Sequence, residues 1–186
     1  MAEAGVESEV KLRVADAEGA RAALRRLGAR ITQPRHFEDN VLFDDPARSL
    51  AASGRIVRLR RTDHGSFLTF KGPRRVADGI KVREEHESAV GDPDAVERVL
   101  RGLGLGPAFR YQKYREAWGF QDVEIVVDET PIGVFLEIEG PAAGIHAAAL
   151  ALGRAPSDFI ADSYVALFFA AGGAGDMTFP EGPSRP

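Results

Sequence analysis

Hydrophobic and charged residues alternate along several segments of this chain. In residues 6–14, the apolar residues Val6, Val10, Leu12 and Val14 occupy even positions, whereas the charged residues occupy odd positions. This alternation indicates a strand with one apolar face and one charged face. Similar patterns predict further strands at 55–61, 66–71, 80–88, 111–120, 121–128 and 134–139, and an extended segment at 33–43.

Helix signals separate these strands. Residues 16–27 begin with Asp16, a good N-cap, and are followed by Gly28, which favours a helix end. A second helix is predicted from the cap Asp92 and from Pro93 at its first position. It carries an apolar stripe made of Val96, Val99, Leu100 and Leu103. Two short helices are predicted at about 145–152 and 162–171, the second capped by Asp162.

The order of these elements predicts an α+β fold with a largely antiparallel sheet, because hairpin-length connections join many of the strands. The length of 186 residues suits one domain. We therefore assign residues 1–171 to a single folded domain. Residues 172–186 are rich in glycine and proline, which predicts a flexible C-terminal tail.

Composition excludes several classes of function. The net charge of −4 argues against a nucleic-acid partner, since sequence-independent binding depends on excess positive charge. The absence of cysteine excludes disulfides, thiolate metal sites and cysteine nucleophiles. No apolar run approaches 18 residues, so no membrane association through a spanning helix is expected. The first residues lack the basic start and apolar run of a secretory signal, so we expect a cytoplasmic protein.

Within each predicted strand, the charges are concentrated at alternate positions (one parity) and therefore on one face of the strand. The basic members are Lys11, Arg58, Arg60, Lys71, Arg83, Lys113 and Arg115; the acidic members are Glu7, Glu9, Glu85, Glu87, Asp128, Glu137 and Glu139. A sheet with one face in water would also place charges on one parity. However, like charges recur two residues apart, as in Glu7 and Glu9. Because like neighbours repel, these pairs favour binding of multivalent partners with the opposite charge.

The two kinds of pair suit two kinds of partner. Carboxylate clusters suit a hard divalent cation such as Mg²⁺ or Mn²⁺. Arginine and lysine clusters suit phosphate oxygens, which arginine can contact in a bidentate manner. Together they predict a phosphate chain bound with metal. If the sheet closes into a barrel, the seven basic and seven acidic residues balance each other, which an enclosed interior requires.

The motifs that carry these charges resemble those of the CYTH family, also called triphosphate tunnel metalloenzymes. Six motifs occur in family order between residues 6 and 169: Glu7-Ser8-Glu9-Val10-Lys11, Arg58-Leu59-Arg60, Leu68-Thr69-Phe70-Lys71-Gly72-Pro73, Arg83-Glu84-Glu85-His86-Glu87, Lys113-Tyr114-Arg115 with Asp128, and Gly133-Val134-Phe135-Leu136-Glu137-Ile138-Glu139. In one departure, Val134 separates the glycine from the phenylalanine of the last motif.

The resemblance implies a closed eight-stranded antiparallel β-barrel, open as a tunnel, with helices packed outside. It implies that Glu7, Glu9 and Lys11 are catalytic. The residues that would bind the triphosphate are Lys11, Arg58, Arg60, Lys71, Arg83, Lys113 and Arg115. The residues that would bind Mg²⁺ or Mn²⁺ are Glu7, Glu9, Glu85, Glu87, Asp128, Glu137 and Glu139. The choice between Glu85 and Glu87 stays open, because the spacing after Lys71 varies in the family.

The expected function is metal-dependent hydrolysis of a triphosphate-bearing small molecule, such as inorganic triphosphate, a nucleoside triphosphate or thiamine triphosphate. The first alternative is a class IV adenylyl cyclase, which converts ATP to cyclic AMP and pyrophosphate. The second is a module that binds polyphosphate or a nucleotide without turnover. The number of carboxylates favours an enzyme over this module, because phosphate binding alone does not require them.

Overall fold

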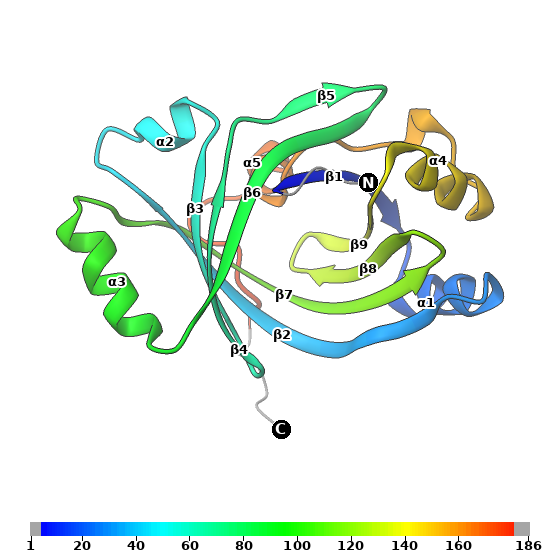
Figure 1. The fold of residues 1–186 in the computed structure, drawn as a ribbon, viewed down its shortest axis with the longest axis horizontal. Helices are drawn as coiled ribbons and strands as arrows, with labels where there is room; N and C mark the ends of the chain where they lie inside the picture. Colours follow the sequence, from blue (N-terminus) through cyan, green and yellow to red (C-terminus); the bar gives the residue numbers. More distant parts are fainter. Residues whose placement is uncertain (1–4, 181–186) are drawn as a thin grey trace.

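The computed structural model of the protein describes residues 5–180. Within this range, nine strands form one antiparallel sheet: β1 (Val6–Val14), β2 (Arg30–Asp44), β3 (Ile56–Thr62), β4 (Gly65–Lys71), β5 (Arg75–Ala77), β6 (Ile80–Val90), β7 (Gly106–Phe120), β8 (Val123–Thr130) and β9 (Gly133–Glu139). The strand order is β1-β9-β8-β7-β2-β3-β4-β6-β5, and β1 also pairs with β6. This last pairing closes eight strands into a barrel and leaves β5 as an addition to β6 (Figure 1). The predicted α+β fold with a closed eight-stranded antiparallel barrel is therefore confirmed.

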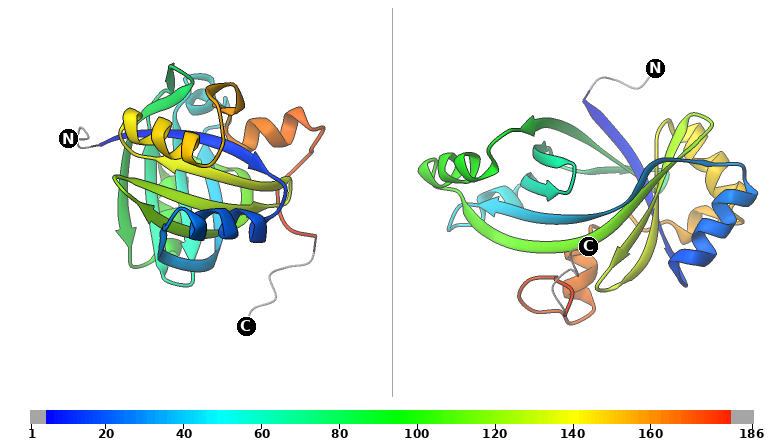
Figure 2. Two further views of the ribbon diagram at one scale, coloured as in Figure 1. Left: turned by 90° about the vertical axis from the view of Figure 1, so that its right-hand side faces the viewer. Right: turned by 90° about the horizontal axis from the view of Figure 1, so that it is seen from below.

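The helices lie outside this barrel. They are α1 (Ala17–Arg26), α2 (Ser49–Ala52), α3 (Pro93–Gly102), α4 (Ala142–Ala151) and α5 (Tyr164–Ala170), with a 3₁₀ turn at Pro156–Asp158. Helices α1 and α4 pack on the outer face of β8 and β9, and α3 packs on β3 at the other side (Figures 1 and 2). None of the helices in the described range is long and apolar enough to cross a bilayer.

The apolar parity of the strands packs beneath these helices. Leu12, Leu136 and Ile138 are buried in one cluster that extends to the helical residues Leu24 and Ile145. A second cluster lies under α3 and includes Phe43, Leu59 and Leu100. The hydrophobic core is therefore outside the barrel, which reserves the interior for polar side chains.

The predicted helix caps agree with the structure at two helices. Asp16 accepts a hydrogen bond from the backbone N–H of Gly19, and Asp92 accepts from Asp94 and Ala95. The prediction for α5 is wrong, because the cap is Ser163, whose Oγ accepts from the N–H of Ala166 at 3.2 Å. Asp162 instead forms an ion pair with Arg74 at 3.1 Å.

Two short elements were not predicted from the sequence. The strand β5 forms a hairpin with β6 through the two-residue turn Asp78-Gly79, where both residues have positive φ. Asp-Gly is a strong signal for such a turn. The helix α2 is a single turn in which Asp44 accepts hydrogen bonds from the N–H groups of Leu50 and Ala51. Each element is too short to show a periodic pattern of hydrophobic residues.

The first part of the predicted flexible tail is docked against β7. The N–H of Met177 donates to the carbonyl of Arg110 at 2.9 Å, and the N–H of Gln112 donates to the carbonyl of Met177 at 3.0 Å. Strand β8 pairs with β7 only from Tyr114 onward, which leaves the preceding backbone edge free for this contact. The flexibility of the tail from residue 172 stays a prediction, and residues 181–186 lie outside the described range.

We predict that this docking contributes to stability. Met177 is 1% exposed and packs in a cluster with Phe109, Phe135 and Tyr164. Met177→Ala should lower the free energy of unfolding by about 2–5 kcal/mol, as expected for truncation of a buried methionine. Val99→Ala, on the exposed side of α3, should change it by less than about 0.5 kcal/mol. Equal effects in urea denaturation would show that the tail is not docked in solution.

Candidate active site

The charged parity faces the interior of the barrel, which encloses a cavity of about 370 Å³. Thirteen of the fourteen residues predicted for the site line this cavity. The fourteenth, Asp128, is completely buried and contacts Lys113 and Arg115. By contrast, Arg61 lies on the other parity, and its guanidinium contacts Asp94 on α3 at 2.8 Å. The strand parity used in the sequence analysis is therefore correct.

Lys11 lies at the centre of the interior. It is paired in register with Glu137 across β1 and β9, and its Nζ is 2.6 Å from the Glu137 Oε1. Burial opposes its positive charge, but the carboxylates of Glu137 and Glu9 outweigh this effect and raise the pKa of Lys11. Its Nζ also lies 4.3 Å from the centre of the Tyr164 ring. Lys11 is thus held charged inside the barrel.

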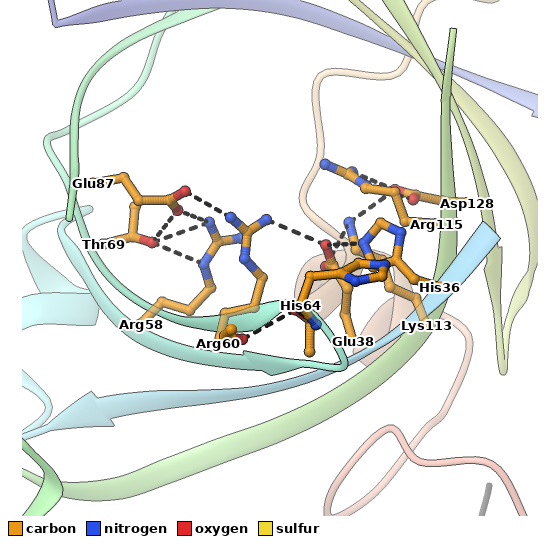
Figure 3. A network of polar contacts seen from close by, with 12 residues as sticks. His36, Glu38, Arg58, Arg60, His64, Thr69, Glu87, Lys113, Arg115 and Asp128 are labelled. Atoms are coloured by element: carbon orange, nitrogen blue, oxygen red, sulfur yellow. Dashed lines mark hydrogen bonds and ion pairs between the residues drawn. The ribbon is translucent and has the colours of Figure 1, made fainter. Parts of the chain in front are cut away.

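Asp128 organises a second cluster of cations (Figure 3). Arg115 makes a bidentate contact with it, at 2.7 Å from Nε and 2.6 Å from Nη2, and Lys113 donates at 3.0 Å. The hydroxyl of Tyr164, at the start of α5, donates to the same carboxylate at 2.8 Å. Both oxygens of Asp128 are therefore engaged, and their contacts fix the positions of Arg115 and Lys113.

Glu87 organises the arginines of β3 on the opposite wall (Figure 3). Its two oxygens accept from Arg60 at 2.6 Å and from Arg58 at 3.2 Å, and Thr69 donates to it at 2.7 Å. Arg60 reaches Glu38 as well, at 3.2 Å. Two arginines two residues apart on one strand are thereby held side by side.

Lys71 lies between two carboxylates at a third position. Its Nζ is 2.8 Å from a Glu7 oxygen and 2.6 Å from a Glu85 oxygen. The structure therefore brings both Glu85 and Glu87 into the interior, and Arg58 contacts both of them, at 3.7 Å and 3.2 Å. Arg83 differs from the other bases, because its guanidinium donates to the backbone carbonyls of Gly72 and Gly54.

Several interior residues were missed in the sequence analysis. Lys81 contacts Glu9 and shares the parity of Arg83, so the alternation that identified Arg83 applied to it too. Glu38 is 1% exposed. Burial opposes its negative charge, but Lys113 and His36 overcome this and hold the pKa of Glu38 well below its ordinary value. Glu124 lines the cavity as well.

A row of carboxylates crosses three adjacent strands. Glu9 of β1 is in register with Glu139 of β9, which is in register with Glu124 of β8. Partial burial, together with the charges of Glu7 and Glu9, raises the pKa of Glu139 to about 7. These oxygen donors suit Mg²⁺ or Mn²⁺. Within residues 5–180, however, no three potential ligands converge as the side chains stand, because Glu7 and Glu9 contact lysines.

This crowding gives a prediction on stability. The ordinary pKa of a glutamate is 4.5, whereas that of Glu139 in the fold is about 7. The folded state therefore binds the proton more tightly, so stability falls as the pH rises from 4.5 to 7 and stays lowered above 7. In EDTA, Glu139→Gln should raise the melting temperature at pH 8 but not at pH 4. Glu18→Gln, on the outside of α1, should give no such pH-dependent gain; a gain of equal size there would refute the cause given.

Comparison with known proteins finds relatives in sequence and in structure. A protein of Methanocaldococcus jannaschii named "Putative adenylate cyclase" is 28% identical over 143 residues, which are 76% of this chain and 80% of that protein. A structure from Vibrio parahaemolyticus with the same name has a TM-score of 0.79 at 17% identity, and covers 90% of this chain and 99% of its own.

A further structure, "Putative adenylyl cyclase HpAC1" from Hippeastrum, is reported to have a dominant triphosphatase activity. It has a TM-score of 0.67 at 20% identity, and covers 90% of this chain and 97% of its own. At these identities the two structures show a shared fold. The model of one protein family, described as the CYTH domain, matches residues 5–151. The barrel, its charged interior and this match lead to one conclusion: the chain belongs to the CYTH domain family.

Proposed function

We propose that this protein hydrolyses a phosphoanhydride bond of a triphosphate-bearing small molecule inside the barrel, with Mg²⁺ or Mn²⁺ as cofactor. One observation carries the proposal. The interior basic residues contact carboxylates around a cavity of about 370 Å³ that is lined mainly by charged side chains. Because buried charges are costly, a fold keeps such a set where a charged ligand uses it.

The phosphate chain would bind to the basic residues of the interior. We assign Lys11, Arg58, Arg60, Lys71, Lys113 and Arg115 to it. Arg83 is the weakest member of the predicted set, because its donors are already used by backbone carbonyls. Asp128 and Glu87 act on this set as positioning residues, since each holds two cations in place.

The metal would be held by carboxylates near Glu9. We assign Glu7, Glu9 and Glu139 to it, with Glu85 and Glu137 as further candidates from the predicted set. Asp128 and Glu87 are better explained by the cations they position. When bound, Mg²⁺ or Mn²⁺ would supply positive charge to the phosphate oxygens. To bind metal, these carboxylates would have to release the lysines that they contact. A phosphate chain that binds those lysines would favour the release.

The chain's own residues would then lower the barrier by electrostatic stabilisation. In the reaction, the oxygen of water bonds to a phosphorus and the bond from that phosphorus to the bridging oxygen breaks, which places negative charge on the leaving phosphate. Lys113 and Arg115 are held in place by Asp128 before the substrate arrives, so they can offset that charge with little reorganisation.

Cyclisation of ATP is the second candidate, and the name of the Methanocaldococcus relative favours it. The two reactions differ in the nucleophile, which is water in one and the ribose 3′-hydroxyl in the other. Their products differ accordingly. A third possibility, binding without turnover, predicts tight metal-dependent binding of a triphosphate with no product.

The proposal is tested with a panel of inorganic triphosphate, ATP, GTP and thiamine triphosphate, each with Mg²⁺ or Mn²⁺. Release of orthophosphate is expected from at least one of them, and EDTA should abolish it. Cyclic AMP with pyrophosphate would establish the cyclase instead. Glu9→Gln should reduce kcat/KM by at least tenfold, with the fold verified by its melting curve. Unchanged turnover in EDTA would refute metal dependence.

A further prediction uses three arginines of β3. Arg58→Ala and Arg60→Ala each remove a charge-assisted contact worth about 1.5–3 kcal/mol. This loss should reduce kcat/KM roughly ten- to a hundredfold on the best substrate. Arg61→Ala is the control, because Arg61 contacts α3 outside the barrel and exposed ion pairs contribute up to about 1 kcal/mol. If Arg61→Ala were as damaging as Arg58→Ala, the phosphate site would not lie in the interior.

A further inference from the structure

A second cavity, of about 540 Å³, adjoins the charged one. The two cavities share six lining residues: Leu42, Ile56, Lys81, Arg83, Ser163 and Val165. The two cavities therefore meet at these side chains, and one end of a molecule bound in the barrel would lie beside the second cavity. Its volume is within the range of cavities that hold small organic ligands.

The walls of this second cavity are mainly apolar. Helix α5 contributes Val165, Ala166 and Phe169, and the first part of β7 contributes Phe109. Phe169 is 50% exposed, and its ring lies 5.5 Å from that of Phe109. An exposed aromatic ring at the wall of a cavity offers a face on which another flat ring can stack.

The charged groups around this cavity are almost all positive. Arg48, Arg55 and Arg83 line it and have no carboxylate partner among the described residues, whereas Arg74 and Lys81 line it and are paired with Asp162 and Glu9. Among the described residues that line it, the only carboxylate is Asp44, whose two oxygens accept hydrogen bonds from the N–H groups of Leu50 and Ala51. A cationic group would therefore meet repulsion here without a free carboxylate to offset it.

We propose that this cavity binds the organic group of a triphosphate ester, and that the preferred group is an uncharged aromatic ring such as a nucleobase. A cationic ring, such as that of thiamine, is disfavoured. The inference rests on the proposed function for one point, namely that the phosphate chain occupies the barrel. It adds a second site and a rule for substrate choice.

The cavity is tested by filling it. Ala166 is exposed and lines the second cavity but not the charged one. Ala166→Trp should raise the Kd for ATP, measured by calorimetry, at least tenfold and lower kcat/KM for ATP at least tenfold. The same two values for inorganic triphosphate should change less than twofold. The matched control is Ala170→Trp, on the same helix at an exposed residue that lines neither cavity. It should affect neither ligand.

The charge rule is tested by reversing one charge. The unaltered protein should prefer ATP to thiamine triphosphate in Kd. Arg55→Glu should shift this ratio at least fivefold toward thiamine triphosphate. Arg26→Glu, at the exposed end of α1, should leave the ratio unchanged.

The outcomes separate the two proposals. Equal losses for ATP and inorganic triphosphate in Ala166→Trp, or a preference of the unaltered protein for thiamine triphosphate, would overturn the second site. Binding of ATP and thiamine triphosphate without turnover would overturn the proposed hydrolysis, while the ratio of their two Kd values would still test the second site. Failure of every triphosphate to bind would overturn both.

Discussion

The structure depends on one constraint: charges enclosed in a barrel must be neutralised by neighbours. Each interior cation except Arg83 contacts at least one carboxylate, and Lys11, Lys71 and Arg115 contact two each. Such contacts require the correct strand register, since a shift of one residue would turn every interior charge outward. Neutralisation therefore ties the closure of the barrel to the order of charges along each strand. The pairing of β1 with β6, which completes the barrel, brings Glu9 to Lys81.

The same constraint explains where the helices lie. A polar interior cannot serve as the hydrophobic core, so the outward parity must supply it. Residues such as Leu136 and Ile125 need a cover, which α1 and α4 provide. The start of α5 has a different role, because Tyr164 reaches the interior and donates to Asp128. This helix thus links the charged cavity to the apolar one beside it.

The sequence indicated which face of a strand each side chain occupies, but much less about which side chains contact one another. Alternation was enough to place Arg58 inside and Arg61 outside, because neighbouring side chains of a strand point to opposite faces. It could not predict that Lys71 meets Glu7, which lies far away in sequence, since that contact depends on how the barrel closes. The place where Met177 docks could not be predicted for a related reason: it depends on a free backbone edge of β7, and the residues that pair with an edge carry no sequence signature of it.

The ion pairs inside the barrel also bear on how its proposed ligands would act on each other. Lys71 contacts oxygens of both Glu7 and Glu85. A phosphate chain that drew Lys71 away would leave these carboxylates without a cation, and they would then suit a divalent metal. Conversely, carboxylates that held a metal would leave Lys71 available to phosphate. Because such coupling is reciprocal, each ligand would raise the affinity of the interior for the other.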